Sequence, residues 1–209
     1  MLLGIVTDIH EDVPALEKAL AEFRSRGVDQ VVNLGDACDL YSAAHSRTPE
    51  VVALLKGAGA VGVWGNHDIA LCHEVPERVR ERAEPEVLEY MATMKPRLSL
   101  GGCHFSHVDP WADPHDPGQI WVVSDPPDTP EGRTKSFGAV TEKHSFIGHY
   151  HRWRVFTPEE RIEWDANGPI TLGGETRYLV VVGPVMGGWC ATFDTDSHVL
   201  TPIRVGEKG

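Results

Sequence analysis

Three apolar segments in the first third of the chain each run into a polar loop, and this order restricts the fold more than any other feature. The segments extend from Leu2 to Thr7, from Val28 to Leu34 and from Ala60 to Val63. The polar sequences that follow them are Asp8-Ile9-His10, Gly35-Asp36 and Trp64-Gly65-Asn66-His67-Asp68. Short continuous apolar runs are typical of parallel strands that are buried on both faces. The pattern therefore predicts an α/β fold.

The segment between the first two strands carries the signals of a helix. Asp12 and Pro14 are typical of a helix start, and Gly27 is typical of a helix end. Another helix, further along, has Met91 and Met94 in its apolar stripe, and both are predicted to be core residues. Because strand-helix-strand crossovers are right-handed and parallel, the polar loops after successive strands are expected to meet at one edge of the sheet.

Composition excludes some classes of partner. With 209 residues, of which 41% are hydrophobic, the chain fits one domain over residues 1–209, and two smaller domains are the alternative. Nineteen basic and 31 acidic residues give a formal net charge of -12, which opposes binding to a nucleic-acid polymer or an anionic membrane. The expected partner is a small molecule, and the oligomeric state is not predicted.

The cysteines and the chain start indicate the compartment. The four cysteines are widely spaced without a Cys-x-x-Cys pair, so they are predicted to be buried free thiols: Cys38, Cys72, Cys103 and Cys190. The first residues have no basic region or cleavage site typical of a signal peptide. No apolar run approaches the ~18 residues of a membrane span. We therefore expect a cytoplasmic protein.

Two later strands end in histidines. Residues 98–107 predict a hairpin, in which His104 and His107 face opposite sides because they lie three apart on a strand. Only His107, at the strand end, is expected in a site. A strand near residues 143–147 ends in Gly148-His149-Tyr150-His151, which places His149 and His151 on one side of an extended backbone.

The rest of the second half predicts strands and one irregular segment. From residue 154 onward, six short apolar segments alternate with turn sequences, and we expect them to form a second sheet that packs on the first. The Pro-rich segment from Asp109 to about Thr134 is predicted to be an active-site lid or a disordered loop. Its two tryptophans, Trp111 and Trp121, favour a packed segment.

Each polar group has a simpler explanation when it is taken alone. Asn-His-Asp and Gly-Asp after a strand often form turns or helix caps. In combination, the groups follow successive strands in a fixed order: Asp8-x-His10, Gly35-Asp36, Gly65-Asn66-His67-Asp68, His107 and Gly148-His149-x-His151. From Leu3 to about Phe193 this order resembles the calcineurin-like metallophosphoesterases, and among them the small single-domain bacterial and archaeal phosphodiesterases. The resemblance implies a four-layer α/β/β/α sandwich.

The same residues predict a metal centre. Two divalent ions at ~3.5–4 Å from each other need a bridging carboxylate with oxygen and imidazole ligands around each ion, and Asp36 is placed to bridge. The resemblance implies the remaining ligands, which are Asp8, His10 and His151 for one ion and Asn66, His107 and His149 for the other. This donor set without thiolate suits manganese, iron, zinc, nickel or cobalt and disfavours calcium or magnesium. We expect manganese to support activity in vitro.

His67 is needed by neither ion. The resemblance implies that His67 contacts the substrate phosphate and protonates the leaving group, with Asp68 as its orienting partner. A hydroxide between the metals would attack phosphorus in line, without a phosphoenzyme. The alternative for His67 and Asp68 is a purely structural role in the loop.

Three departures from the family pattern lie beside the expected cleft. Val108 follows the site histidine where glycine is common, and Tyr150 stands where threonine or serine is common. Residues 183–186 are Gly-Pro-Val-Met where the small phosphodiesterases tend to carry Asn-Pro-Gly-Ser. None of these changes removes a ligand, but substrate shape is expected to differ. Arg152 and Arg154 either bind a second phosphate or extend along the surface, and we favour the second interpretation.

The sequence thus leads to one main hypothesis and two alternatives. The main hypothesis is a binuclear metal-dependent phosphoesterase acting on small phosphodiesters. A phosphomonoesterase acting on proteins or nucleotides is the first alternative. A non-catalytic scaffold is the second, and the complete set of ligand residues opposes it.

Overall fold

Each of the two sheets takes strands from distant parts of the chain. The computed structural model describes residues 1–39, 46–122 and 124–206. The first sheet has the order β3 (Val61–Gly62), β2 (Gln30–Asn33), β1 (Leu2–Val6), β11 (Trp189–Asp194), β12 (Val199–Arg204) and β9 (Ile170–Thr171). The second has the order β4 (Leu98–Leu100), β5 (Cys103–Phe105), β6 (His144–Ile147), β10 (Tyr178–Val181), β7 (Arg154–Phe156) and β8 (Arg161–Ile162). Strands β1 to β3 are parallel, and so are β5, β6 and β10.

The expectation that the C-terminal strands all belong to the second sheet is wrong. Strand β11 pairs antiparallel with β1, with Phe193 opposite Leu3, and β12 and β9 extend the first sheet beyond it. Strand β1 lies in the middle of the protein, where an edge without a partner would bury unpaired N–H and C=O groups. Pairing with β11 satisfies those groups.

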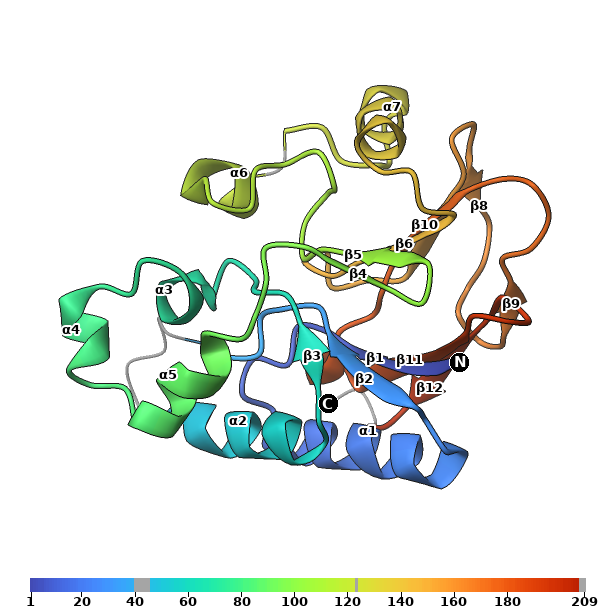
Figure 1. Cartoon of the computed structure of the whole chain (residues 1–209). Coiled ribbons are helices and arrows are strands. Elements are labelled where there is room, and N and C mark those ends of the chain that lie inside the picture. The colour runs from blue at the N-terminus through green and yellow to red at the C-terminus, as the bar shows by residue number, and fades with distance from the viewer. Residues whose placement is uncertain (40–45, 123, 207–209) are drawn as a thin grey trace.

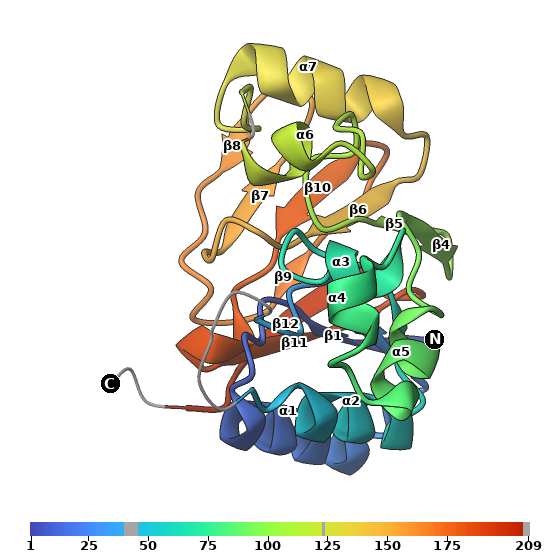
Figure 2. The same ribbon diagram turned by 90° about the vertical axis from the view of Figure 1, so that its left-hand side faces the viewer.

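Helices cover the outer faces of both sheets, which gives the predicted four-layer α/β/β/α sandwich (Figure 1). Helices α1 (Val13–Arg26), α2 (Thr48–Gly57) and α5 (Pro85–Met91) lie on the side of the first sheet, and α7 (Pro130–Ala139) lies on the opposite side of the molecule (Figure 2). The connections contain the short helices α3 (Ile69–Cys72), α4 (Glu77–Arg80) and α6 (Pro117–Trp121) and the 3-10 turn η1 (Val185–Gly187). None of the helices in the described ranges has the length and apolar composition of a membrane span.

Helix α1 begins and ends where the sequence predicts. The Asp12 carboxylate accepts a hydrogen bond from the Ala15 N–H at 3.1 Å, and Gly27 ends the helix with a left-handed φ of 68°. The predicted apolar face is buried, and it includes Leu16, Leu20 and Phe23. The helix therefore fixes the loop that joins it to β1.

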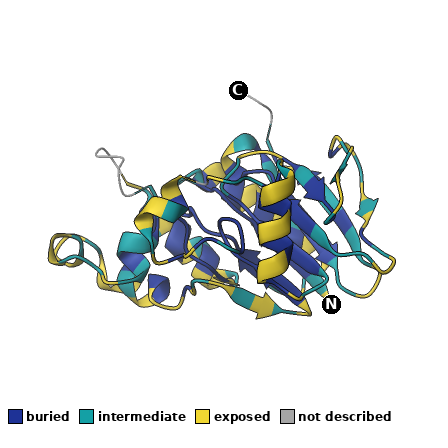
Figure 3. Cartoon of the chain, turned by 90° about the horizontal axis from the view of Figure 1, so that it is seen from above, coloured by how far each residue is buried: buried dark blue, intermediate teal, exposed yellow. Residues whose placement is uncertain are grey.

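Three apolar clusters lie between the four layers. Leu55 of α2 and Met91 of α5 belong to the cluster that includes α1. Phe193 belongs to the cluster between the two sheets, and Phe137 of α7 packs with Leu179 on the outer face of the second sheet. Figure 3 shows the strands as mostly buried and shows exposed residues on the outward side of α7, the helix that crosses in front of them. The strands that lead to the polar loops are thus held on both faces.

The remaining core predictions are confirmed with one qualification. Met91 and Met94 are buried. The cysteines are free thiols, of which Cys38, Cys103 and Cys190 are buried and Cys72 is partly buried.

The Pro-rich segment is packed against the rest of the protein. Apart from Val123, which lies outside the described residues, the segment contains α6 and the start of α7. Ile120 of α6 packs with Val108 and Ala112, and Trp111 lies against the same cluster. The disordered loop that the sequence left open is therefore excluded for the described part of the segment.

Candidate metal centre

Five loops, each following a strand, bring the predicted ligands together. The loops after β1, β2 and β3 carry the first four ligands, and the loops after β5 and β6 carry the other three. In chain order they are Asp8, His10, Asp36, Asn66, His107, His149 and His151. The carboxyl ends of parallel strands are where α/β sheets place their sites. All seven side chains lie in one cluster, and their role as metal ligands stays a prediction.

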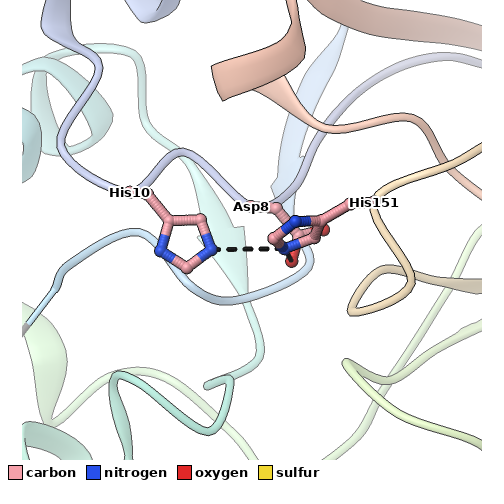
Figure 4. A group of neighbouring side chains, drawn as sticks. All are labelled: Asp8, His10 and His151. Carbon is pink, nitrogen blue, oxygen red and sulfur yellow. Dashed lines mark hydrogen bonds and ion pairs between the residues drawn. The ribbon is translucent and has the colours of Figure 1, made fainter.

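Asp8, His10 and His151 form the first group (Figure 4). Asp8 is fully buried, and its Oδ1 lies 3.2 Å from His151 Nε2. His10 Nε2 points toward His151 Nε2 at 3.3 Å. The Thr7 hydroxyl and the backbone N–H of His149 both donate to Asp8 Oδ2, at 2.8 and 3.1 Å. These hydrogen bonds fix the carboxylate beside the two imidazoles.

Asp36 lies between the two groups of histidines. The residue is 2% exposed, and its Oδ2 lies 3.2 Å from His107 Nε2 and 3.8 Å from His10 Nε2. Its Oδ1 accepts the backbone N–H of His67 at 2.9 Å. Asp36 therefore approaches one histidine of each predicted ligand group, as a bridging carboxylate must.

Asn66 and two histidines form the second group. Asn66 Oδ1 lies 3.0 Å from His107 Nε2 and 3.0 Å from His149 Nδ1. His107 Nδ1 donates to the backbone carbonyl of Leu34 at 2.8 Å, and this hydrogen bond directs Nε2 into the site. The other histidine of the hairpin, His104, is buried within β5.

The protonation states of these side chains are linked. Burial raises the pKa of Asp36, but His107 and the His67 N–H outweigh burial and hold that pKa below its ordinary value. Burial lowers the pKa of His107, whereas the neighbouring Asp36 carboxylate raises it, with a net pKa of about 9. Burial and nearby His107 lower the pKa of His149 to about 4. At neutral pH the proton therefore resides on His107 beside an ionised Asp36 carboxylate, and a metal ion that takes His107 Nε2 as ligand must displace that proton.

The backbone of the site is strained. Nine described residues other than glycine have a positive φ, and five of these are predicted ligands. The five are Asp8 (48°), His10 (44°), Asp36 (51°), His149 (66°) and His151 (50°), so the extended backbone expected at His149 and His151 is wrong. Such conformations cost roughly 1–3 kcal/mol each and persist only where surrounding structure supports them. This concentration favours a functional site over the simple turns that the sequence left as an alternative.

Glycines allow the close approach of backbone to both buried carboxylates. A Cβ atom on Gly65 would lie 2.1 Å from Asp36 Oδ1. A Cβ atom on Gly148 would lie 2.0 Å from the Thr7 hydroxyl and 2.9 Å from Asp8 Oδ2. The glycines that precede Asn66 and His149 in the sequence motifs are therefore required by space.

The cluster fits divalent metal ions. Within the part of the chain that the structure describes, the ion pairs of Asp8 and Asp36 are with histidines, and none is with lysine or arginine. Buried carboxylates need a compensating positive charge. The His and Asp side chains form three groups of three residues, and within each group the donor atoms lie within 4.8 Å of one another. Asp8 and Asp36 each belong to two of these groups. Carboxylate and imidazole donors without thiolate suit manganese, iron, zinc, nickel or cobalt.

The prediction that Asp68 orients His67 is wrong. Asp68 is fully buried, and its carboxylate accepts three backbone N–H groups at 3.0 to 3.2 Å, from Ala37, Cys38 and Gly65. Asp68 therefore ties the loop after β2 to the loop after β3. His67 Nδ1 instead lies 3.1 Å from Asp39 Oδ1. The sequence offered no distinguishing signal for Asp39, because one acidic residue in a loop is common in a chain with 31 of them.

Comparison with known proteins identifies the family. The sequence profile of the calcineurin-like phosphoesterase superfamily domain matches residues 1–182. The chain belongs to the calcineurin-like phosphoesterase superfamily. It is accordingly a metal-dependent hydrolase of phosphoric esters. Comparison with curated proteins gives no significant match.

Solved structures share the fold of this calcineurin-like phosphoesterase. A metallophosphoesterase from Sphaerobacter thermophilus superposes with a TM-score of 0.76 at 22% identity, over 100% of this chain and 89% of the other. A hypothetical protein from Pyrococcus horikoshii OT3 gives a TM-score of 0.64 at 16% identity, over 100% and 88%. A novel archaeal phosphodiesterase gives a TM-score of 0.55 at 14% identity, over 98% of this chain and 99% of the other. At these identities the similarity shows the fold.

Replacing Gly65 by alanine should weaken metal binding by this phosphoesterase. The new Cβ atom would lie 2.1 Å from Asp36 Oδ1 and 2.5 Å from its backbone nitrogen, so Asp36 must move. The affinity for manganese, measured by titration calorimetry, is expected to fall at least ~10-fold, which is usual when the support of a ligand is disturbed. Gly57→Ala is the control, because its Cβ atom would meet nothing within 4 Å. Equal manganese affinity in the two variants would contradict the assignment.

Proposed function

We propose that this phosphoesterase uses a binuclear metal centre to hydrolyse small phosphodiesters. The observation that carries the proposal is the position of Asp36, a buried carboxylate within 3.8 Å of one histidine from each ligand group. One ion would take Asp8, His10 and His151, the other would take Asn66, His107 and His149, and Asp36 would be shared. Two bound ions would stabilise negative charge on the phosphoryl oxygens and lower the pKa of the attacking water.

His67 is proposed as the proton donor to the leaving group. Its backbone N–H donates to Asp36, and its ring lies against the His10 ring with 4.7 Å between centroids. The His67 side chain is 21% exposed, so substrate can reach it. Because Asp39 binds Nδ1, the other ring nitrogen, Nε2, is the one that would protonate the departing oxygen.

The choice of substrate and metal rests on the family and on charge. The resemblance to the small phosphodiesterases favours diesters, and a phosphomonoesterase is the alternative. A formal net charge of -12 supports a small-molecule ester over a nucleic-acid polymer. We propose manganese as the ion that supports activity in vitro and the cytoplasm as the compartment.

An assay of two esters tests this proposal. The protein is treated with a chelator and dialysed, and manganese is then added back with bis-p-nitrophenyl phosphate or p-nitrophenyl phosphate. Chelated protein should be inactive, and manganese should restore activity with a higher kcat/KM for the diester. Preferential turnover of the monoester would establish the alternative substrate class. Turnover of neither ester by the manganese-loaded protein would contradict the proposed hydrolase activity.

Replacing His67 by alanine should separate proton donation from metal binding. General acid catalysis contributes typically ~10²–10⁴-fold, and it matters most for a poor leaving group. We expect a loss of that size for an alkyl or nucleoside ester and a much smaller loss for p-nitrophenyl esters, with unchanged metal content. Asp39→Asn should show a weaker form of the same dependence on the leaving group. His67 also comes within 4.8 Å of donor atoms of His10 and Asp36, so loss of an ion in the variant would identify His67 as a ligand instead.

Trp121 is expected to influence substrate choice. Its ring lies 4.8 Å from the His67 ring between centroids, and the residue is 41% exposed, so a group attached to the leaving oxygen would pass close to it. Trp121→Ala should change the ratio of diester to monoester turnover and leave metal content unchanged. Val122→Ala is a matched control, because that residue is adjacent and 71% exposed. An unchanged ratio would reduce the Pro-rich segment to a packing role.

A further inference from the structure

Tyr150, the residue between His149 and His151, is hydrogen-bonded to a buried carboxylate. Its hydroxyl donates to Asp109 Oδ2, and the Ser136 hydroxyl of α7 donates to Asp109 Oδ1 at 3.0 Å. Asp109 and Ser136 are each 1% exposed. The carboxylate of Asp109 is therefore held by two hydroxyl groups from different parts of the chain.

This network joins the two loops that supply histidines from the second sheet. Asp109 lies two residues after His107 in the loop that follows β5, and Tyr150 lies in the loop that follows β6. The two loops also meet where the Gly148 N–H donates to the His107 carbonyl at 3.0 Å. Ser136 adds a connection to α7, so the network fixes both loops relative to a helix outside the site.

The loop after β6 needs such support. His149 and His151 have positive φ values of 66° and 50°, which cost free energy that other contacts must offset. The Tyr150 ring packs edge-on against the His149 ring with 5.4 Å between centroids. The Arg152 guanidinium carbon lies 5.6 Å from the centroid of the Tyr150 ring. Arg152 in turn donates a hydrogen bond to the Asp128 carboxylate at 2.9 Å. The ring is thus confined by its hydroxyl contact and by neighbours at the ring.

We propose that Tyr150, Asp109 and Ser136 form a positioning network that sets the separation of His107 and His149. These two imidazoles both approach Asn66 Oδ1 at 3.0 Å, and small shifts of either loop would separate them. The inference rests on the proposed function in one respect, since His107 and His149 are assigned there to the same ion. Groups that orient metal ligands typically contribute ~10–100-fold to metal affinity.

Tyr150→Phe tests the network because it removes one hydroxyl and preserves the ring. Manganese affinity, measured by titration calorimetry on chelated and dialysed protein, is expected to fall at least ~10-fold. Ser136→Ala should cause a smaller fall, because Tyr150 still donates to Asp109. Tyr90→Phe is the matched control: the Tyr90 hydroxyl is also buried, and it donates to the Ala60 carbonyl at 3.2 Å. That variant should bind manganese like the wild type.

Two further measurements separate positioning from stability and from the proposed function. In the presence of chelator, the midpoint of thermal unfolding should fall by a similar amount in Tyr150→Phe and Tyr90→Phe, whereas manganese affinity should fall in Tyr150→Phe alone. Combining Tyr150→Phe with Asp109→Asn should weaken binding no more than Asp109→Asn does, because the two side chains act through one contact. Wild-type affinity in Tyr150→Phe, or an equal loss in Tyr90→Phe, would overturn the network. If the wild type binds only one ion, the binuclear proposal fails, and the network is judged by the affinity of that ion.

Discussion

The buried carboxylate of Asp36 is the group on which the rest of the site depends. It is 2% exposed, has a left-handed backbone, and approaches His10 and His107 from the two ligand groups. A buried charge of this kind is unfavourable unless opposite charge and hydrogen bonds compensate it. The His67 N–H supplies one such bond, and the absence of a Cβ atom on Gly65 supplies the space. The loop after β3 is therefore shaped around a residue of the loop after β2.

The architecture explains why these loops meet. Each sheet contains three neighbouring parallel strands, which are β1, β2 and β3 in the first sheet and β5, β6 and β10 in the second. The carboxyl ends of both sets of strands lie toward one site. The pairing of β1 with β11 completes the first sheet, and the apolar cluster around Phe193 packs the two sheets together. Outside the two sheets, the Pro-rich segment places the Trp121 ring 4.8 Å from the His67 ring, although this segment contains none of the predicted metal ligands.

Sequence patterns predicted much of this site and failed at identifiable points. Strand ends are recognisable from apolar runs, so Asp8, Asp36 and His107 could be assigned to one cluster before the structure was known. Pairing between distant strands leaves no comparable mark, which is why the place of β11 beside β1 was missed. The family resemblance implied that Asp68 orients His67, but the Asp68 carboxylate instead accepts backbone N–H groups from the loops after β2 and β3. The contact of Tyr150 with Asp109 joins residues 41 positions apart, and neither belongs to a sequence motif that predicts the other.

Under the proposed mechanism, Asp36 would bridge two metal ions. Crystals soaked in manganese and measured at the manganese absorption edge test it directly, because anomalous scattering locates each ion without reference to activity. If Asp36 is the bridge, two peaks are expected roughly 3.5–4 Å apart, with the Asp36 carboxylate in contact with both. A single peak, or two peaks of which only one touches Asp36, would contradict it.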